Sequence, residues 1–78
     1  MNDPFVAQQA EKWAERSLAA EEESQQRVQW MYESAFGRPP SEEELKTSLE
    51  FVEDRGDIET WKHFAHALIN TKEFIFLR

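Results

Sequence analysis

The sequence contains no cysteine, only two glycines, and no apolar run longer than four residues. The lack of cysteine excludes a disulfide framework and a thiolate metal site. Two glycines are too few for the glycine-rich loops that bind nucleotide phosphates. A transmembrane helix needs about 20 consecutive apolar residues, which the chain does not have. Residues 1–20 also lack the basic start and apolar centre of a signal peptide.

Positive charge is also scarce, because 9 Lys and Arg residues face 16 Asp and Glu residues, for a net charge of −7. This balance disfavours nucleic acids and anionic membrane surfaces as partners, since their phosphates would be repelled. The excess of acid lies in residues 1–53, whereas residues 54–78 are neutral overall. We interpret the acidic part as solvated helix faces that keep a small protein soluble.

A length of 78 residues predicts a single domain over residues 1–78. So short a chain buries a small core, and it has ten aromatic residues with which to build it. Each aromatic side chain can bury about 150–250 Å². The sequence therefore predicts a core in which aromatic side chains supply most of the buried area.

Four segments carry apolar side chains at the i, i+3, i+4, i+7 spacing of an α-helix. The first is predicted to begin at Asn2 or Asp3, which can cap it, with Pro4 in the first turn. It is expected to end near Glu21–Glu23, where three acids oppose the helix dipole. Its predicted inward stripe consists of Val6, Ala10, Trp13, Ala14 and Ser17.

The second helix is predicted over residues 25–36, with Ser24 as its cap and Gly37 as its left-handed end. Arg38 is the one base among residues 28–45, an otherwise acidic stretch. We expect its side chain to bind carbonyl groups at the end of this helix or a nearby glutamate. Pro39 and Pro40 then prevent the helix from continuing.

The third helix has the strongest local signal, a capping box in which Ser41 and Glu44 satisfy each other's backbone N–H groups. We expect it to run to Arg55 and to be ended by Gly56. Its predicted inward residues are Leu45, Leu49 and Val52.

The fourth helix is predicted to begin after Asp57 as its cap and to end at Asn70 in a left-handed conformation. Thr71 can then cap a further short turn over residues 72–77, and an extended tail packed on the helices is the alternative. The fold class is therefore all-α: a small compact antiparallel bundle of three to four helices plus a short C-terminal turn. The predicted core contains Trp13, Tyr32, Leu49, Trp61, Phe64 and Leu68.

His63 and His66 form an H-x-x-H pair, with Glu59 and Asn70 on the same side of the helix. A structural zinc site needs four protein ligands and a catalytic one needs three, usually held in a shaped pocket. An exposed helix face does not provide such a pocket, so we expect no metal here. No catalytic sequence motif is present either, and we predict neither catalytic residues nor cofactors nor enzymatic activity.

Trp30 and Phe51 lie off the apolar stripes of their helices. Two interpretations remain open. Small bundles often bury such flanking aromatic side chains against neighbouring helices. Alternatively, the two side chains form an exposed contact surface for a partner. We name Trp30 and Phe51 as the candidate interaction residues.

Three phrases occur together in order: residues 2–6 (NDPFV), Tyr32 followed by residues 37–40 (GRPP), and Trp61 followed by residues 67–70 (ALIN) and 73–74 (EF). In these phrases the chain resembles the C-terminal segment of the large planctomycete-type proteins of unknown function, which often carry a cytochrome-c-like domain. The resemblance implies that residues 1–78 are a fragment of a larger, exported polypeptide. It implies no activity, and the haem-binding motif of the neighbouring domain is absent here.

We therefore expect a non-enzymatic structural or protein-interaction module that is monomeric when isolated. Its expected partners are upstream domains of the same polypeptide or another protein, and not nucleic acid or membrane. The alternative is a small-ligand or glycan-binding module that uses exposed aromatic side chains, with Trp30 as its centre.

Overall fold

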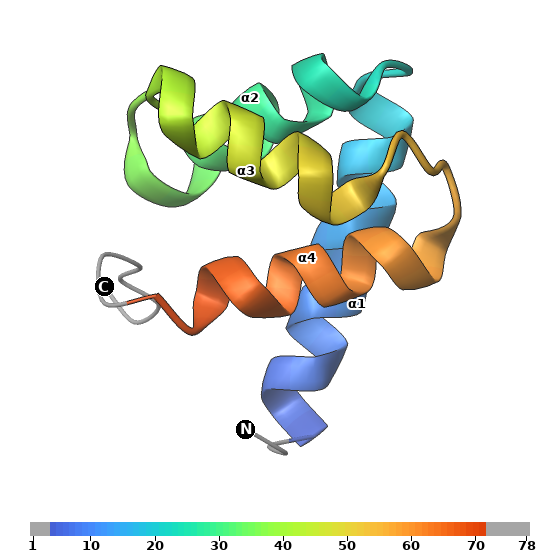
Figure 1. Ribbon diagram of the computed structural model, residues 1–78. Helices are drawn as coiled ribbons and strands as arrows, with labels where there is room; N and C mark the ends of the chain where they lie inside the picture. Colours follow the sequence, from blue (N-terminus) through green and yellow to red (C-terminus); the bar gives the residue numbers. More distant parts are fainter. Residues whose placement is uncertain (1–3, 72–78) are drawn as a thin grey trace.

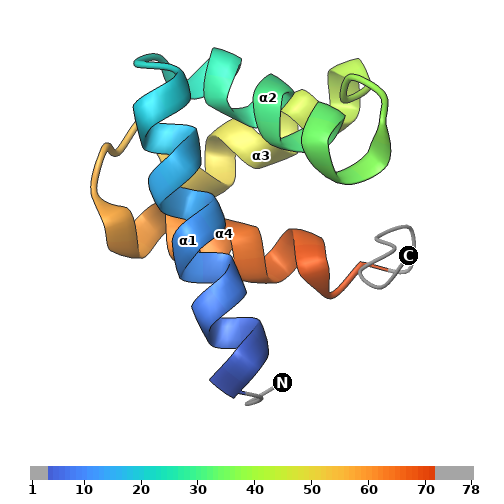
Figure 2. The same cartoon turned by 180° about the vertical axis from the view of Figure 1, so that it is seen from behind.

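The computed structural model describes residues 4–71. This part of the chain forms four α-helices and no strand: α1 Pro4–Ala20, α2 Ser24–Phe36, α3 Glu42–Val52 and α4 Ile58–Ile69. The prediction of a small all-α bundle is confirmed. Helices α2, α3 and α4 run back and forth, while α1 crosses α4 on its far side in Figure 1 and its near side in Figure 2. Helix α1 makes its most extensive contacts with α4.

Helix α1 buries the inward stripe that the sequence predicts, and no other residue of this helix is fully buried. Its one polar member, Ser17, is satisfied locally because its hydroxyl donates to the carbonyl of Ala14 at 2.8 Å. The predicted caps Asn2 and Asp3 lie outside the described residues. The buried set is Val6, Ala10, Trp13, Ala14 and Ser17.

The prediction that Ser24 caps α2 is wrong. The cap position is Glu23, which makes no side-chain capping bond, and Ser24 is the first helical residue. The Ser24 hydroxyl instead donates to Asp54 Oδ1 at 3.1 Å, a bond between residues 30 positions apart. The hydroxyl is therefore bonded to a residue distant in the sequence and not to a backbone N–H group of its own helix. At the other end, Gly37 closes the helix in the left-handed conformation at φ 71°, as predicted.

Helix α3 begins at the predicted capping box. The Glu44 N–H donates to Ser41 Oγ at 3.1 Å, and the Ser41 N–H donates to Glu44 Oε1 at 2.8 Å. The predicted end at Gly56 is wrong, because the helix stops at Val52 and Glu53 adopts φ 54°. Asp54 follows at φ 60°. These left-handed residues turn the chain three positions early and bring the Asp54 carboxylate to α2.

Helix α4 begins after Asp57, which caps it as predicted, and the Asp57 carboxylate accepts from the Thr60 N–H at 2.9 Å. That bond, together with one from the Thr60 hydroxyl, lowers the pKa of Asp57. The predicted left-handed end at Asn70 is wrong, since its φ is −83°. The Asn70 N–H bonds back to the His66 carbonyl, which continues the helical pattern. The predicted turn over residues 72–77 lies outside the described residues.

The core gathers side chains from all four helices. Of the predicted core residues only Leu49 is wrongly placed, because it is partly buried at the margin of the core. Helix α3 contacts both α2 and α4, and its most buried line runs between them through Ser48 and Val52. The core cluster is Ala10, Trp13, Ala14, Val28, Met31, Tyr32, Val52, Trp61, Phe64, Ala65 and Leu68.

Candidate functional site

Trp30 lies at the edge of the core. Its side chain is partly buried and packs against the core cluster. It also lines an open pocket of about 200 Å³ on the outer face of α2. Trp30 is therefore packed against the core and also lines a hollow, and its role as an interaction residue stays a prediction. The pocket is lined by Glu21, Gln26, Gln29, Trp30 and Glu33.

Four of these five lining residues come from one face of α2. Gln26, Gln29, Trp30 and Glu33 follow the i, i+3, i+4, i+7 spacing, which places their side chains along a single stripe. Glu21 comes from the link that follows α1. The lining set contains two carboxylates, two amides and one indole, and none of its members is basic.

Arg27 is a buried residue that the sequence analysis did not single out. Its side chain is only 9% exposed. Its Nε donates to the carbonyl of Glu21 at 2.6 Å, and its guanidinium lies 5.4 Å from the centre of the Trp61 ring. A signal was available, because Arg27 precedes Met31 by four positions on the buried side of α2. The positive charge of this helix is thus directed to the core rather than to the pocket at Trp30.

Phe51 is the second predicted interaction residue, and it does not lie at the pocket of Trp30. Its side chain is 50% exposed, and its ring centre lies 5.7 Å from that of Phe64, which belongs to the core. An exposed aromatic ring that already rests on the core loses little conformational entropy when a partner covers it. The two candidate residues therefore belong to separate surfaces.

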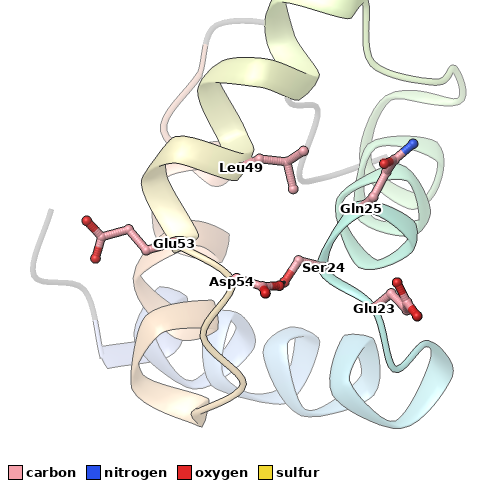
Figure 3. A pocket seen from close by; sticks show the side chains of 6 residues that line it. All are labelled: Glu23, Ser24, Gln25, Leu49, Glu53 and Asp54. Atoms are coloured by element: carbon pink, nitrogen blue, oxygen red, sulfur yellow. The ribbon is translucent and has the colours of Figure 1, made fainter.

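A second pocket, of about 370 Å³, lies between the start of α2 and the end of α3. Figure 3 shows the side chains that line it, with Ser24 and Asp54 directed toward each other. Histidine is the base that most often activates a serine nucleophile, and no histidine is among the lining residues. The Ser24–Asp54 bond instead ties α2 to the segment after α3. The lining is Glu23, Ser24, Gln25, Leu49, Glu53 and Asp54.

Arg38 binds a glutamate, as predicted. Its Nη1 and Nη2 donate to the two carboxylate oxygens of Glu44 at 2.8 and 3.1 Å, and Nη1 also donates to the carbonyl of Pro39 at 3.0 Å. These bonds from Arg38, with a further one from the Ser41 backbone, lower the pKa of Glu44 to about 2. The guanidinium also lies 5.7 Å from the ring centres of Tyr32 and Phe36. Arg38 thus fastens the connection between α2 and α3.

The histidine pair lies on the outer side of α4, where His63 is exposed and His66 is partly exposed. Across residues 4–71 there is no group of three or more histidine, aspartate or glutamate residues that could hold a metal ion. The prediction that no metal binds this chain stays a prediction. None of the helices within that range has the length and apolar character needed to cross a bilayer.

Comparison with known families finds a match over the first part of the chain. The family model described as "PSD1: Protein of unknown function (DUF1553)" matches residues 1–52, which is two thirds of the chain. This range includes two of the three phrases that carry the resemblance, the opening NDPFV and the GRPP turn. The predicted relationship to proteins of unknown function is confirmed. No curated protein and no solved structure matches the chain.

Proposed function

This chain belongs to the PSD1 family of proteins of unknown function (DUF1553), and we propose that it is a non-enzymatic protein-interaction module of a larger, exported polypeptide. Its partners are upstream domains of that polypeptide or another protein. The observation that carries the proposal is Phe51, a large apolar side chain that is half exposed and rests directly on Phe64 of the core. Such a ring offers a partner an apolar contact surface whose position is already fixed by the core.

The engagement of the polar side chains is consistent with a role without catalysis. Ser24 is bonded to Asp54, Ser41 to Glu44, and Arg38 to Glu44. The first and third of these bonds join separate segments, and the second caps the start of α3, so all three contribute to the fold. General acid–base catalysis would need a polar group aimed at a bound substrate in a cleft.

The test measures whether Phe51 is covered in the larger polypeptide. Because the chain has no cysteine, Phe51→Cys introduces a single thiol into the domain. We expect this thiol to react with maleimide at least about tenfold more slowly in the larger polypeptide than in the 78-residue chain, because the partner excludes the reagent. The matched control is Glu11→Cys, an exposed position on α1 that should react equally in both. Peptide mass spectrometry identifies the labelled site.

Equal labelling of the Phe51→Cys variant in the two proteins would overturn the proposal. An outcome in which the Phe51→Cys and Glu11→Cys thiols slow down together would also contradict it, because that result reports general shielding rather than contact at Phe51. Phe51→Ser is a second variant for the same question. Circular dichroism should show that this variant folds like the parent. In the larger polypeptide, a neighbouring thiol introduced by Glu50→Cys should react faster with maleimide when Phe51→Ser is also present than when Phe51 is retained.

A second candidate function, a small-ligand or glycan-binding module, is favoured by one observation. The pocket at Trp30 places two amide side chains, Gln26 and Gln29, beside an indole ring. Amides can hydrogen-bond sugar hydroxyl groups, and an indole face can pack on a sugar ring. Titration of the chain with cellohexaose, followed at the Trp30 indole by NMR, tests this alternative.

A further inference from the structure

We propose that the pocket at Trp30 binds a cationic side chain, lysine or arginine, of a partner protein. The inference rests on the proposed interaction role and specifies the partner's chemistry at one of the two surfaces. Its basis is the combination of one indole and two carboxylates among the residues that line the hollow. A cation placed over a tryptophan face is attracted by the negative face of the ring, and tryptophan is the best aromatic residue for this contact.

The charges around the pocket have one sign. Glu21 and Glu33 are the two acidic residues of the lining, and no lysine, arginine or histidine is among the lining residues. The basic residue nearest in the sequence, Arg27, is not among the lining residues, because it is buried and its guanidinium lies over Trp61. Of the ion pairs found among residues 4–71, none neutralises Glu21 or Glu33. An incoming lysine or arginine would therefore meet uncompensated carboxylates.

The dimensions of the pocket also favour a side chain over a larger ligand. Sites for small molecules usually measure about 300–1,000 Å³, and this pocket is smaller, at about 200 Å³. The lining is an open stripe along α2, so a partner could lay an extended segment across it and insert one basic residue. A neutral sugar chain would hydrogen-bond Gln26 and Gln29, but the negative charge of the two carboxylates would not strengthen its binding. This difference distinguishes the two ligand classes.

The experiment titrates the ¹⁵N-labelled 78-residue chain with an acetylated and amidated hexalysine peptide. The readout is the indole N–H signal of Trp30, which is assigned by its loss in Trp30→Phe. We expect a saturable shift of this signal. The binding affinity obtained from it should fall by about threefold or more between 20 and 300 mM NaCl, because salt screens exposed charges. The indole signals of Trp13 and Trp61 should stay in place, since those N–H groups are bonded to Ser34 and Arg55.

Matched charge variants separate the pocket from the general acidity of the chain. Glu21→Gln combined with Glu33→Gln should weaken hexalysine binding by about three- to tenfold. The control combines Glu11→Gln with Glu15→Gln, which also removes two negative charges, but from exposed positions of α1. It should weaken binding by less than about twofold. Trp30→Leu should weaken binding by about two- to fivefold through loss of the indole.

Three results would overturn the inference. One is an unchanged Trp30 signal with millimolar hexalysine. Another is equal weakening by the pocket pair and the α1 pair, which would show attraction to the whole protein. The third is a shift of Trp30 with cellohexaose but not with hexalysine, which would favour the glycan alternative. The proposed function is judged separately, because protection of Phe51 in the larger polypeptide does not depend on hexalysine binding. A failure of that protection with intact peptide binding would reject the interaction surface at Phe51 and keep the cation site.

Discussion

The crossing pair α1–α4 and the antiparallel pair α2–α3 are held together in different ways. The first pair meets through apolar side chains. Ala10 and Ala14 of α1 are completely buried, as are Trp61 and Ala65 of α4. Small residues at a helix crossing allow the two backbones to approach closely, and the large indole of Trp61 fills the remaining volume. This contact is the most extensive between any two helices of the described chain.

The pair α2–α3 adds polar bonds at its two ends to the buried side chains of Val28, Met31 and Val52. At the turn, Arg38 binds both carboxylate oxygens of Glu44, which also closes the capping box with Ser41. At the open end, Ser24 binds Asp54. The apolar residues Leu45 and Leu49 between these bonds are only partly buried.

The difference shows that one small domain can draw its stability from two physical sources. Apolar burial depends little on pH or salt, whereas bonds between partly exposed charged groups weaken when either partner is neutralised or screened. Changes in the crossing pair should therefore have large effects under all conditions, and changes in the α2–α3 pair should have smaller, condition-dependent effects.

The largest expected effect comes from Trp61→Ala in the crossing pair. The substitution removes a completely buried ring, the bond from its indole N–H to the Arg55 carbonyl at 2.6 Å and the contact with Arg27. It should lower the free energy of unfolding by about 3–5 kcal/mol, which is comparable with the whole stability of so small a domain. Urea unfolding followed by circular dichroism measures the change. A variant that unfolds at the same urea concentration as the parent would contradict this description of the core.

A second variant tests the close approach of α1 and α4. Ala14→Leu places three extra carbon atoms at a fully buried position and should cost about 1–3 kcal/mol through overpacking. The matched control is Ala19→Leu, on the exposed side of the same helix, which should change stability by less than about 0.5 kcal/mol. Equal effects of the two substitutions would mean that the crossing is not tightly packed at Ala14.

A third variant examines how α3 ends. Glu53 occupies the left-handed C-terminal position at φ 54°, where glycine has no steric penalty. Glu53→Gly should therefore stabilise the chain by about 0.5–1 kcal/mol. Glu50→Gly, inside the same helix, should destabilise it by about 1 kcal/mol. Thermal unfolding at pH 7 distinguishes the opposite signs, and a loss of stability in both variants would argue against the observed helix end.

The smallest effect is expected at the turn between α2 and α3, and it should depend on pH. The pKa of Glu44 is lowered from 4.5 to about 2, so its contribution is present above pH 4.5 and is lost as the pH falls toward 2. Arg38→Ala should cost about 0.3–1 kcal/mol at pH 7, because this ion pair is about a third exposed on each side. The difference from the parent should shrink toward zero near pH 2. Urea unfolding at both pH values measures it, and a pH-independent difference would assign the role of Arg38 to its ring contacts instead.

Local signals in the sequence were sufficient for most of the secondary structure. The capping box at Ser41, the cap at Asp57 and the helix end at Gly37 were all predicted, because each depends on bonds within a few residues. Two of the errors, the cap of α2 and the end of α3, occurred where a distant partner overrides the local preference. Ser24 bonds to Asp54 instead of capping α2, and this bond accompanies the early end of α3.

The candidate sites were predictable only in part. Trp30 and Phe51 were recognisable because they depart from the apolar stripes of their helices. The lining of each pocket was not, because Glu21 reaches the Trp30 pocket from the link after α1, and Glu53 and Asp54 reach the second pocket from the segment after α3. The position of the Arg27 guanidinium over Trp61 likewise depends on how α2 is placed relative to α4.

The amino-acid sequence by itself determined four amphipathic helices, their main boundaries and the stripe of α1 that is buried. These properties follow from periodicity and from bonds to near neighbours, which act wherever the helix is placed. Only the tertiary structure decided that α1 crosses α4 and that the Arg27 guanidinium lies over Trp61. It also set the pockets at Trp30 and at Asp54, because these features require side chains that meet only after the helices have packed.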